Sequence, residues 1–217
     1  MGNIKKYRAV IFDMDGTIMN TLDDLRDSLN FVLKKHGYAE IDVDQAKHFL
    51  GNGARHFVKC AVPGGEDNPS FDVILSEFTE HYKNNCENKT APYKDIPELI
   101  ERLSQNGYKL AIVSNKPDVA VQILKNTFFP AVDVAVGEKS GVPKKPAPDM
   151  VLAALSALGV EKQNAVYVGD SEVDILTAKN SGLECIAVSW GFRTKDELVL
   201  SGAKIICDDV FSLESNL

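Results

Sequence analysis

Carboxylates that follow short apolar runs are the first candidates for chemistry in this chain. Four of them are Asp13, Asp15, Asp170 and Asp174. The first pair follows the apolar run from Arg8 to Phe12, and the second pair follows the run from Ala165 to Val168. Carboxylates gathered in one place repel one another, and a hard divalent cation with oxygen ligands offsets that repulsion. We therefore expect these residues to form a Mg²⁺ site.

Side chains that could bind a phosphate group occur after another apolar run and in a loop. Ser114, Asn115 and Lys116 come after the apolar run from Lys109 to Val113, and Lys145 lies in a proline-rich loop. A hydroxyl, backbone amides at helix starts and an ammonium group commonly bind phosphates in proteins. Carboxylates, a metal and a phosphate cradle together indicate phosphoryl transfer.

This chemistry gives each candidate a role. Asp13 attacks phosphorus in line and forms an aspartyl phosphate. Asp15 lies two residues on, so at an extended strand end it points to the same side as Asp13. It protonates the leaving alkoxide and later takes a proton from the water that hydrolyses the intermediate. Ser114 and Lys145 hold the equatorial oxygens and stabilise their developing charge.

These residues meet only if the chain folds so that its strand ends share one edge. Apolar runs of strand length occur at 8–12, 109–113, 132–136, 165–168, 185–188 and 204–207. Helical patterns alternate with them at 96–105, 118–126, 149–158 and 173–180. The alternation predicts an α/β fold with a doubly wound, Rossmann-like parallel sheet that is covered on both faces. Ligands bind such sheets at the carboxyl ends of the strands.

One stretch breaks the alternation. From about residue 21 to about residue 89 the chain shows helical periodicity and no convincing strand, with glycines at Gly51 and Gly53 among its breaks. The stretch predicts a small all-helical cap domain of residues 21–89, inserted into an α/β core of residues 1–20 and 90–217. A segment inserted beside the carboxyl end of the first strand is well placed to act as a lid.

Four short motifs of this chain together resemble those of a known enzyme family. They are Asp13-x-Asp15-Gly16-Thr17, Ser114, Lys145 and Gly169-Asp170-x-x-x-Asp174, and in this order they resemble the four motifs of the haloacid dehalogenase-like hydrolases. The resemblance covers almost the whole chain, and it includes a helical cap after the first motif. It implies that Asp13 is the nucleophile. It also implies that Mg²⁺ is bound by Asp13, by the backbone carbonyl of Asp15 and by the fourth motif, with Asp170 and Asp174.

Within that family the chain looks most like the phosphoglycolate phosphatases. Three segments carry this likeness: Gly51-Asn52-Gly53-Ala54-Arg55, Ser114-Asn115-Lys116-Pro117 and Ser189-Trp190-Gly191-Phe192. The resemblance implies a further set of substrate contacts, namely Thr17, Asn115, Lys116, Gly51, Asn52, Gly53 and Arg55. Arg55 would supply a planar cation for a substrate carboxylate. One departure is Asn20-Thr21, where relatives usually have an acidic residue before Ser or Thr.

Each residue also has a simpler interpretation. Ser114 alone suits a helix N-cap, Asp174 suits the start of a helix, and Arg55 suits a solvated surface. Lys144 neighbours Lys145, and the proline after Lys145 favours the second lysine as the phosphate ligand. Trp190 is expected to pack beneath the site.

Several other functions share these motifs. A phosphomutase uses the same two aspartates but must exclude water from the phosphoenzyme. A pyrophosphatase or a sugar or nucleotide phosphatase would have the same cap, whereas a dehalogenase needs neither Asp15 nor a metal. A phosphoacceptor signalling module places similar residues at strand ends of a similar sheet, but it has no helical insertion, and fold alone does not decide function.

The net charge, the apolar runs and the cysteine spacing limit the kinds of partner and location that we expect for this chain. The net charge of −7 argues against a nucleic-acid binder, so an anionic substrate needs local positive charge at its site. The apolar run from Ala9 to Phe12 is far too short to span a membrane. The four cysteines show no metal-binding spacing, which favours reduced thiols and a cytoplasmic location. We expect a monomer or homodimer that acts on a small phosphorylated metabolite.

Overall fold

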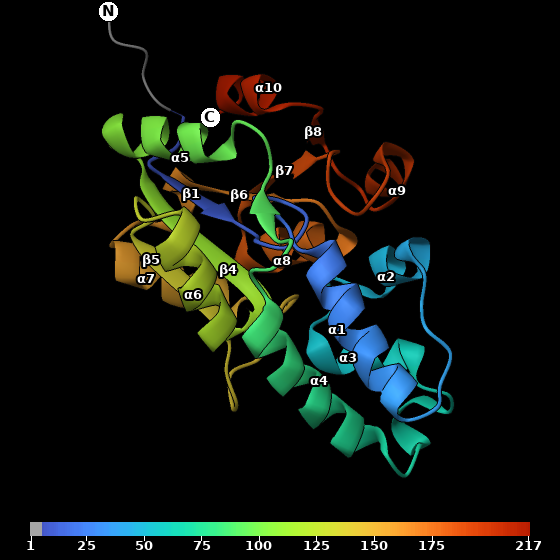
Figure 1. Cartoon of the computed structure of the whole chain (residues 1–217). Coiled ribbons are helices and arrows are strands. Elements are labelled where there is room, and N and C mark those ends of the chain that lie inside the picture. The colour runs from blue at the N-terminus through green and yellow to red at the C-terminus, as the bar shows by residue number, and fades with distance from the viewer. Residues whose placement is uncertain (1–5) are drawn as a thin grey trace, which may run out of the picture.

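The core of the molecule is a six-stranded sheet. The computed structural model describes residues 6–217, so the first five residues of the predicted core segment lie outside the described residues. The strands run in the order β5-β4-β1-β6-β7-β8, and every neighbouring pair is parallel (Figure 1). Their bounds are β1 Ala9–Phe12, β4 Lys109–Pro117, β5 Val134–Glu138, β6 Ala165–Gly169, β7 Glu184–Val188 and β8 Ile205–Cys207.

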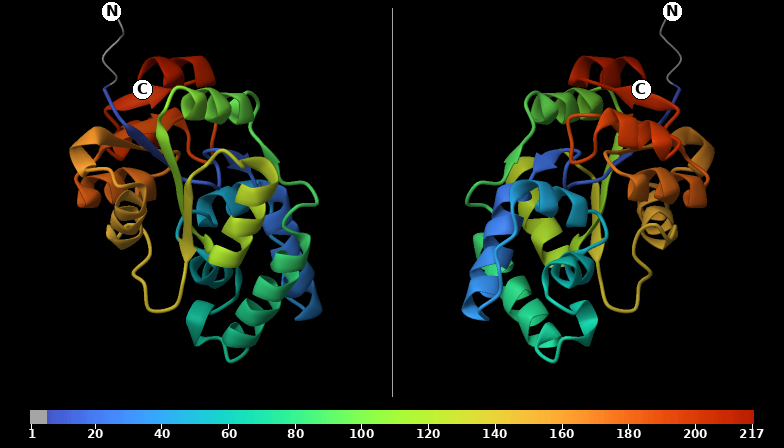
Figure 2. Two further views of the ribbon diagram at one scale, coloured as in Figure 1. Left: turned by 90° about the vertical axis from the view of Figure 1, so that its left-hand side faces the viewer. Right: turned by 90° about the vertical axis from the view of Figure 1, so that its right-hand side faces the viewer.

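Helices cover both faces of this sheet. The helices of one layer are α5 Ile96–Gln105, α6 Asp118–Phe128 and α10 Val210–Ser215, and those of the other are α7 Asp149–Leu158 and α8 Glu172–Ser181. Side chains alternate along β1, so Val10 and Phe12 pack in the first layer while Ala9 and Ile11 pack in the second. Figure 2 shows α6 and α7 on opposite sides of the strands. The predicted doubly wound α/β fold is confirmed.

Some element bounds differ from those expected. Strand β4 continues to Pro117 rather than ending at Val113, and β5 begins two residues late, at Val134. The extra residues of β4 are polar, and hydropathy alone gives no reason to extend a buried strand through them. The short helices α9, Lys195–Leu200, and α10 were not predicted, because six residues hold too few turns to show a periodic apolar face.

The helical insertion builds its own apolar cluster. Its helices are α1 Leu22–Lys35, α2 Val43–Phe49, α3 Ala54–Ala61 and α4 Phe71–Asn85, with a short 3₁₀ helix at Gly65–Asp67. Leu29, Phe57 and Ile74 are buried among them, and the helices lie together below the sheet in Figure 1. The cluster supports our proposal that residues 21–89 form a cap domain on a core of residues 1–20 and 90–217.

Two short strands join the cap to the core. Strand β2, Met19–Asn20, pairs antiparallel with β3, Ala91–Pro92, where the chain enters and leaves the helical segment. The Asp24 carboxylate of α1 accepts hydrogen bonds from the backbone amides of Lys89 and Thr90, at 2.8–3.0 Å. The entry and exit segments are therefore fixed to each other, so the chain passes between core and cap at a single place.

None of the helices in the described part of the chain is long and apolar enough to cross a membrane. All four cysteines are free thiols.

Candidate active site

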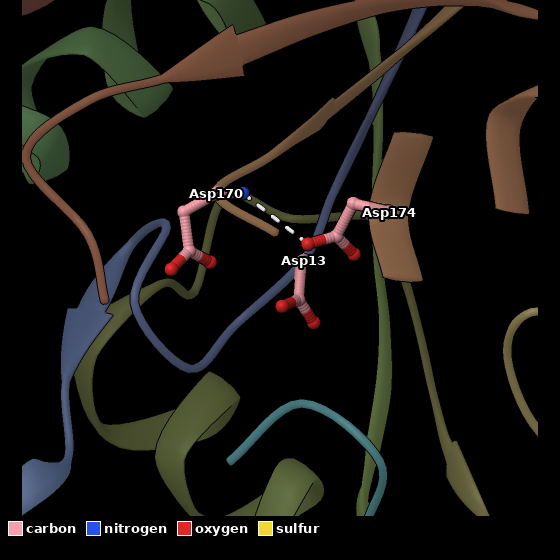
Figure 3. A group of neighbouring side chains, drawn as sticks. All are labelled: Asp13, Asp170 and Asp174. Atoms are coloured by element: carbon pink, nitrogen blue, oxygen red, sulfur yellow. Dashed lines mark hydrogen bonds between the residues drawn. The ribbon is translucent and has the colours of Figure 1, made fainter. Parts of the chain in front are cut away.

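Three buried carboxylates meet at the carboxyl edge of the sheet. Asp13 follows β1 and Asp170 follows β6, and these strands are neighbours, so the fold brings together residues distant in sequence. Asp174 projects from the first turn of α8 beside them (Figure 3). One carboxylate oxygen of each lies within 4.8 Å of the others. Three hard oxygen donors at this spacing suit Mg²⁺ better than a softer metal.

Lys145 is the cation of this cluster. Its ammonium donates to Oδ1 of Asp13 at 2.7 Å, to Oδ1 of Asp174 at 2.9 Å and to the Tyr167 hydroxyl at 3.0 Å. Burial lowers the pKa of Lys145, but the two carboxylates outweigh burial and hold that pKa well above its ordinary value. Lys145 therefore stays charged and neutralises part of the acidic group. Its neighbour Lys144 points elsewhere, to the Asn52 carbonyl of the cap at 2.8 Å.

Asp174 holds neighbouring parts of the site in place through hydrogen bonds to both of its carboxylate oxygens. Its Oδ2 accepts hydrogen bonds from the backbone amides of Asp170 and Ser171 and from the Ser171 hydroxyl, at 2.6–3.2 Å. It also forms a capping box with Ser171 at the start of α8, as its simpler interpretation anticipated. Because its other oxygen receives Lys145, Asp174 fixes both the Asp170 loop and the lysine.

The Asp170 carboxyl group is held by two segments, residues 16–17 and residues 191–192. Thr17 donates to Oδ1 at 2.9 Å, and the Phe192 amide donates to Oδ2 at 2.8 Å. Gly16 and Gly191 pack directly against this carboxyl group, and a Cβ added to either would lie 2.3 Å from an Asp170 atom. Gly16 also has φ of 88°, which side-chain-bearing residues rarely adopt. Both glycines are therefore required by the position of Asp170.

Burial makes the ionised forms of these acids costly. It raises the pKa of Asp170 to about 7, with a further contribution from the nearby Asp174 charge. Burial also raises the pKa of Asp13 well above its ordinary value, although Lys145 opposes that change. A bound Mg²⁺ would favour both carboxylates in their charged forms. The donor chemistry and the local excess of negative charge therefore fit this metal.

This electrostatic arrangement predicts a pH-dependent effect on stability. Asp170 binds a proton up to about pH 7 in the folded chain but only up to about pH 4 when unfolded, so its contribution to stability falls as pH rises between those values. In EDTA, the Tm of the wild type should drop by several degrees relative to Asp170→Asn between pH 5 and pH 8. Mg²⁺ should raise the wild-type Tm more at pH 8 than at pH 6. A difference in Tm between the two proteins that is independent of pH would contradict this prediction.

Asp15 lies on the cap side of Asp13 and has two donors. Lys116 donates to its Oδ1 at 2.6 Å, and Thr21, at the start of the cap, donates to the same oxygen at 2.7 Å. Its Oδ2 accepts no hydrogen bond from the described residues. One carboxylate oxygen is thus fixed and the other remains available for proton transfer. In the Asn20-Thr21 pair, the threonine that fits the family pattern links the cap hinge to Asp15, whereas Asn20, the residue that departs from it, accepts a hydrogen bond from the Leu22 amide at 3.3 Å.

Ser114 and Asn115 lie within the polar extension of β4. Ser114 is buried, and its Oγ accepts a hydrogen bond from the Lys116 amide at 3.2 Å. It lies inside the strand, so its simpler interpretation as a helix N-cap is wrong. Asn115 accepts from the Lys145 amide at 2.8 Å and donates to the Lys145 carbonyl at 3.0 Å. Asn115 therefore positions the loop that carries Lys145.

The cap reaches the core through backbone carbonyls of the loop at residues 50–53. The Gly51 carbonyl accepts from Asn115 at 3.1 Å, and the Leu50 carbonyl accepts from Arg193 at 3.0 Å. Gly53 has φ of 83°, and an added Cβ would lie 3.2 Å from the Asn115 carbonyl, so this loop needs glycine to approach the core. The predicted cap loop is therefore in contact with the catalytic edge.

Three predicted substrate contacts are placed differently. Arg55 is exposed and pairs with Glu66 at 2.8 Å and Asp72 at 3.3 Å, so it points away from the site. Its expected role fails because it lies on the outer side of α3. The Thr17 hydroxyl donates a hydrogen bond to Asp170, and the Asn52 backbone carbonyl accepts one from Lys144. Within the described chain, none of the three lines the cavity between cap and core.

That cavity has a polar floor and an apolar roof. The floor comes from the core and contains Asp13, Asp15, Ser114, Asn115, Lys116, Lys145 and Asp170. The roof comes mainly from the cap and contains Leu25, Leu50, Gly51, Gly53, Ala54, Phe57, Phe78 and Tyr82. Most of the predicted site residues thus line one cavity between core and cap, where partial exclusion of water strengthens the interaction of charges.

The order of these residues agrees with one known family. A family model for haloacid dehalogenase-like hydrolases matches residues 10–188. The chain belongs to this family. The family prediction made from the four motifs is confirmed, and the catalytic edge described above is therefore that of a haloacid dehalogenase-like hydrolase.

Individual relatives of this haloacid dehalogenase-like hydrolase are phosphatases by name. The phosphoglycolate phosphatase of Rhodobacter capsulatus is 34% identical over 190 residues, which cover 85% of each chain. The N-acetylmuramic acid 6-phosphate phosphatase of Pseudomonas aeruginosa is 29% identical over 206 residues, covering 94% of this chain and 91% of that protein. A crystal structure from Lactobacillus delbrueckii subsp. bulgaricus, provisionally named a phosphoglycolate phosphatase, is 40% identical with a TM-score of 0.91 and covers 98% of each chain.

Sequence reasoning missed three residues of this hydrolase site. Arg193 joins core to cap through the carbonyls of Lys47 and Leu50, Tyr167 supports Lys145, and Tyr82 lines the roof. Arg193 and Tyr167 carry no local pattern that distinguishes them from ordinary surface and core residues. Tyr82 follows the apolar periodicity of α4, which conceals its hydroxyl among core side chains. Trp190 packs near the site as expected, and its Nε1 donates to a core carbonyl at 3.0 Å.

Proposed function

We propose that this chain is a magnesium-dependent phosphomonoester hydrolase that acts through a phosphoaspartate on Asp13. The observation that carries the proposal is the contact between the Asp13 carboxylate and Lys145, 2.7 Å apart, in the floor of the cavity beneath the cap. A nucleophile beside a permanent cation can approach an anionic phosphate that it would otherwise repel. The phosphatase names of the relatives agree with this chemistry.

The reaction follows from the positions of these side chains. An oxygen of Asp13 forms a bond to phosphorus as the ester P–O bond breaks, while Ser114 and Lys145 stabilise the charge on the equatorial oxygens. Asp15 gives a proton to the departing alkoxide. Water then attacks the phosphorus of the aspartyl phosphate, Asp15 accepts its proton, and inorganic phosphate leaves.

Asp13, Asp170 and the backbone carbonyl of Asp15 would hold the Mg²⁺, with Asp174 supporting them. The bound ion would supply positive charge that offsets the repulsion between the carboxylates and the phosphate.

The substrate is proposed to be a small phosphorylated metabolite such as 2-phosphoglycolate. The cap loop at Gly51 and Gly53 lines the cavity opposite the catalytic edge, and a cavity between two domains favours a small substrate over a macromolecule. Two named relatives act on phosphate esters of organic acids, according to their names. As part of this proposal the protein is cytoplasmic, a monomer or homodimer, and binds neither nucleic acid nor membranes.

Turnover with a general substrate tests the proposal. Purified protein should hydrolyse p-nitrophenyl phosphate over many cycles in Mg²⁺, and excess EDTA should remove at least about 99% of the rate, because the acidic cluster loses its balancing charge. Adding Mg²⁺ back should restore the rate. A single stoichiometric phosphorylation without turnover would instead indicate a phosphoacceptor module, and full activity after chelation would refute the metal requirement.

A further inference from the structure

One buried polar group of a cavity-lining residue lacks a hydrogen bond of normal geometry. Tyr82 lines the cavity and is 3% exposed, and its hydroxyl makes no such bond with the described residues, although Lys116 interacts with it electrostatically. The other buried atoms of this kind belong to His81, Thr90 and Ser181, none of which lines the cavity in the described part of the chain. Burying a hydroxyl without a partner costs free energy, so such a group needs an explanation.

Tyr82 lies next to the residues that handle the leaving group. It belongs to α4 of the cap, and its ring is stacked on Phe78, with ring centroids 6.0 Å apart. The Lys116 ammonium lies 4.7 Å from the centroid of the Tyr82 ring and 2.6 Å from the Asp15 carboxylate. Because Asp15 serves the ester oxygen, Tyr82 and Lys116 lie beside the first atoms beyond that oxygen.

Both groups are hydrogen-bond donors here. Burial raises the pKa of Tyr82, so the phenol keeps its proton. Lys116 carries an ammonium at neutral pH and donates to Asp15. An ammonium has three hydrogens, and one of them is given to Asp15. A phenol and an ammonium together would therefore bind an acceptor, and most strongly an anionic oxygen.

The rest of the roof limits the size and polarity of the ligand. Leu25, Phe57 and Phe78 present apolar surface to the cavity. Hydroxyls of a sugar placed against these side chains would lose their hydrogen bonds to water without replacement. Thr79 and Arg193 also line the cavity, but Thr79 donates to the Leu75 carbonyl, and Arg193 donates to Glu172 and to the carbonyls of Lys47 and Leu50. The cap phenol of Tyr82 and the core ammonium of Lys116 are therefore donors that remain near Asp15, within reach of a short leaving group.

We propose that the Tyr82 hydroxyl and the Lys116 ammonium bind the carboxylate of a short phosphate ester in which one carbon separates that carboxylate from the ester oxygen. The proposal rests on the phosphatase function proposed above and names the substrate class of that site. It transfers the recognition of the carboxylate from Arg55, which is paired outside the cavity, to a pair of donors inside it.

Two alkyl phosphates that differ in a carboxylate test this assignment. The probes are 2-phosphoglycolate and propyl phosphate, both with poor leaving groups. Tyr82→Phe should lower kcat/KM for 2-phosphoglycolate by roughly tenfold to a hundredfold, mainly through KM, because a hydrogen bond to a charged group is lost. The loss on propyl phosphate should stay below about threefold. Tyr38→Phe is the matched control, since its hydroxyl bonds to Asn68 of the cap and not to the cavity.

The possible results distinguish failure of the Tyr82 assignment from failure of the proposed phosphatase function. An equal loss on both esters, or no loss on 2-phosphoglycolate, overturns the role of Tyr82 while the phosphatase function stands. Turnover of p-nitrophenyl phosphate without any turnover of 2-phosphoglycolate also overturns it. No turnover of any ester by the wild type overturns the function together with this inference. A selective loss in Arg55→Ala would return the carboxylate contact to Arg55.

Discussion

Asp13→Asn should abolish turnover, with a loss on the order of 10⁴-fold or more in kcat, because an amide cannot form the phosphoenzyme. The side chain keeps its shape, and Lys145 retains its contacts with Asp174 and Tyr167. We therefore expect the Tm in metal-free buffer to change little. Steady-state rates on p-nitrophenyl phosphate and a thermal melt give the two measurements.

Asp15→Asn is the matched comparison for this variant. It makes the same chemical change two residues away but leaves the nucleophile in place. With p-nitrophenyl phosphate, which needs little protonation on leaving, Asp15→Asn should still form a phosphoenzyme that breaks down slowly. Asp13→Asn should form none with any substrate. Substantial turnover by Asp13→Asn would exclude the covalent mechanism.

The sequence was sufficient for the core fold because its signals are local and repeated. Buried parallel strands appear as apolar runs, and the polar residues that follow them mark the carboxyl edge where Asp13 and Asp170 meet. The choice of Lys145 over Lys144 rested on one neighbouring proline. The structure separates the two lysines, since Lys145 is buried against Asp13 and Lys144 faces the cap.

The cap was harder to interpret because its functional side chains follow the same periodicity as its core. Tyr82 and Phe78 lie four residues apart on one face of α4, so a hydroxyl in the cavity is hidden in an ordinary apolar pattern. Arg55 looked functional because it is cationic and near two glycines. Whether Arg55 points into the cavity depends on which face of α3 packs against the core. In a helix this short, the sequence pattern does not determine that face.

Removing the positive charge of Lys145 should damage stability as well as activity. Lys145→Met keeps most of the side-chain volume but leaves Asp13 and Asp174 buried without their shared cation. Breaking a buried ion pair by removing one partner costs about 3–5 kcal/mol, which corresponds to a fall in Tm of roughly 6–20 °C for a chain of this size. The loss in kcat/KM should be at least about 1,000-fold, because the same ammonium stabilises the transferred phosphate.

Lys144→Met is the control for that variant, because it removes an equal charge from the adjacent residue. Among residues 6–217, Lys144 forms a hydrogen bond only to the Asn52 carbonyl of the cap loop, so we expect less than a tenfold loss in kcat/KM and a small change in Tm. Thermal melts and rates on p-nitrophenyl phosphate compare the two proteins directly. If Lys145→Met kept more than a tenth of the wild-type activity, or if Lys144→Met were the more damaged protein, the ammonium of Lys145 would not be the group that balances Asp13. The buried cluster would then require its positive charge from the bound metal alone.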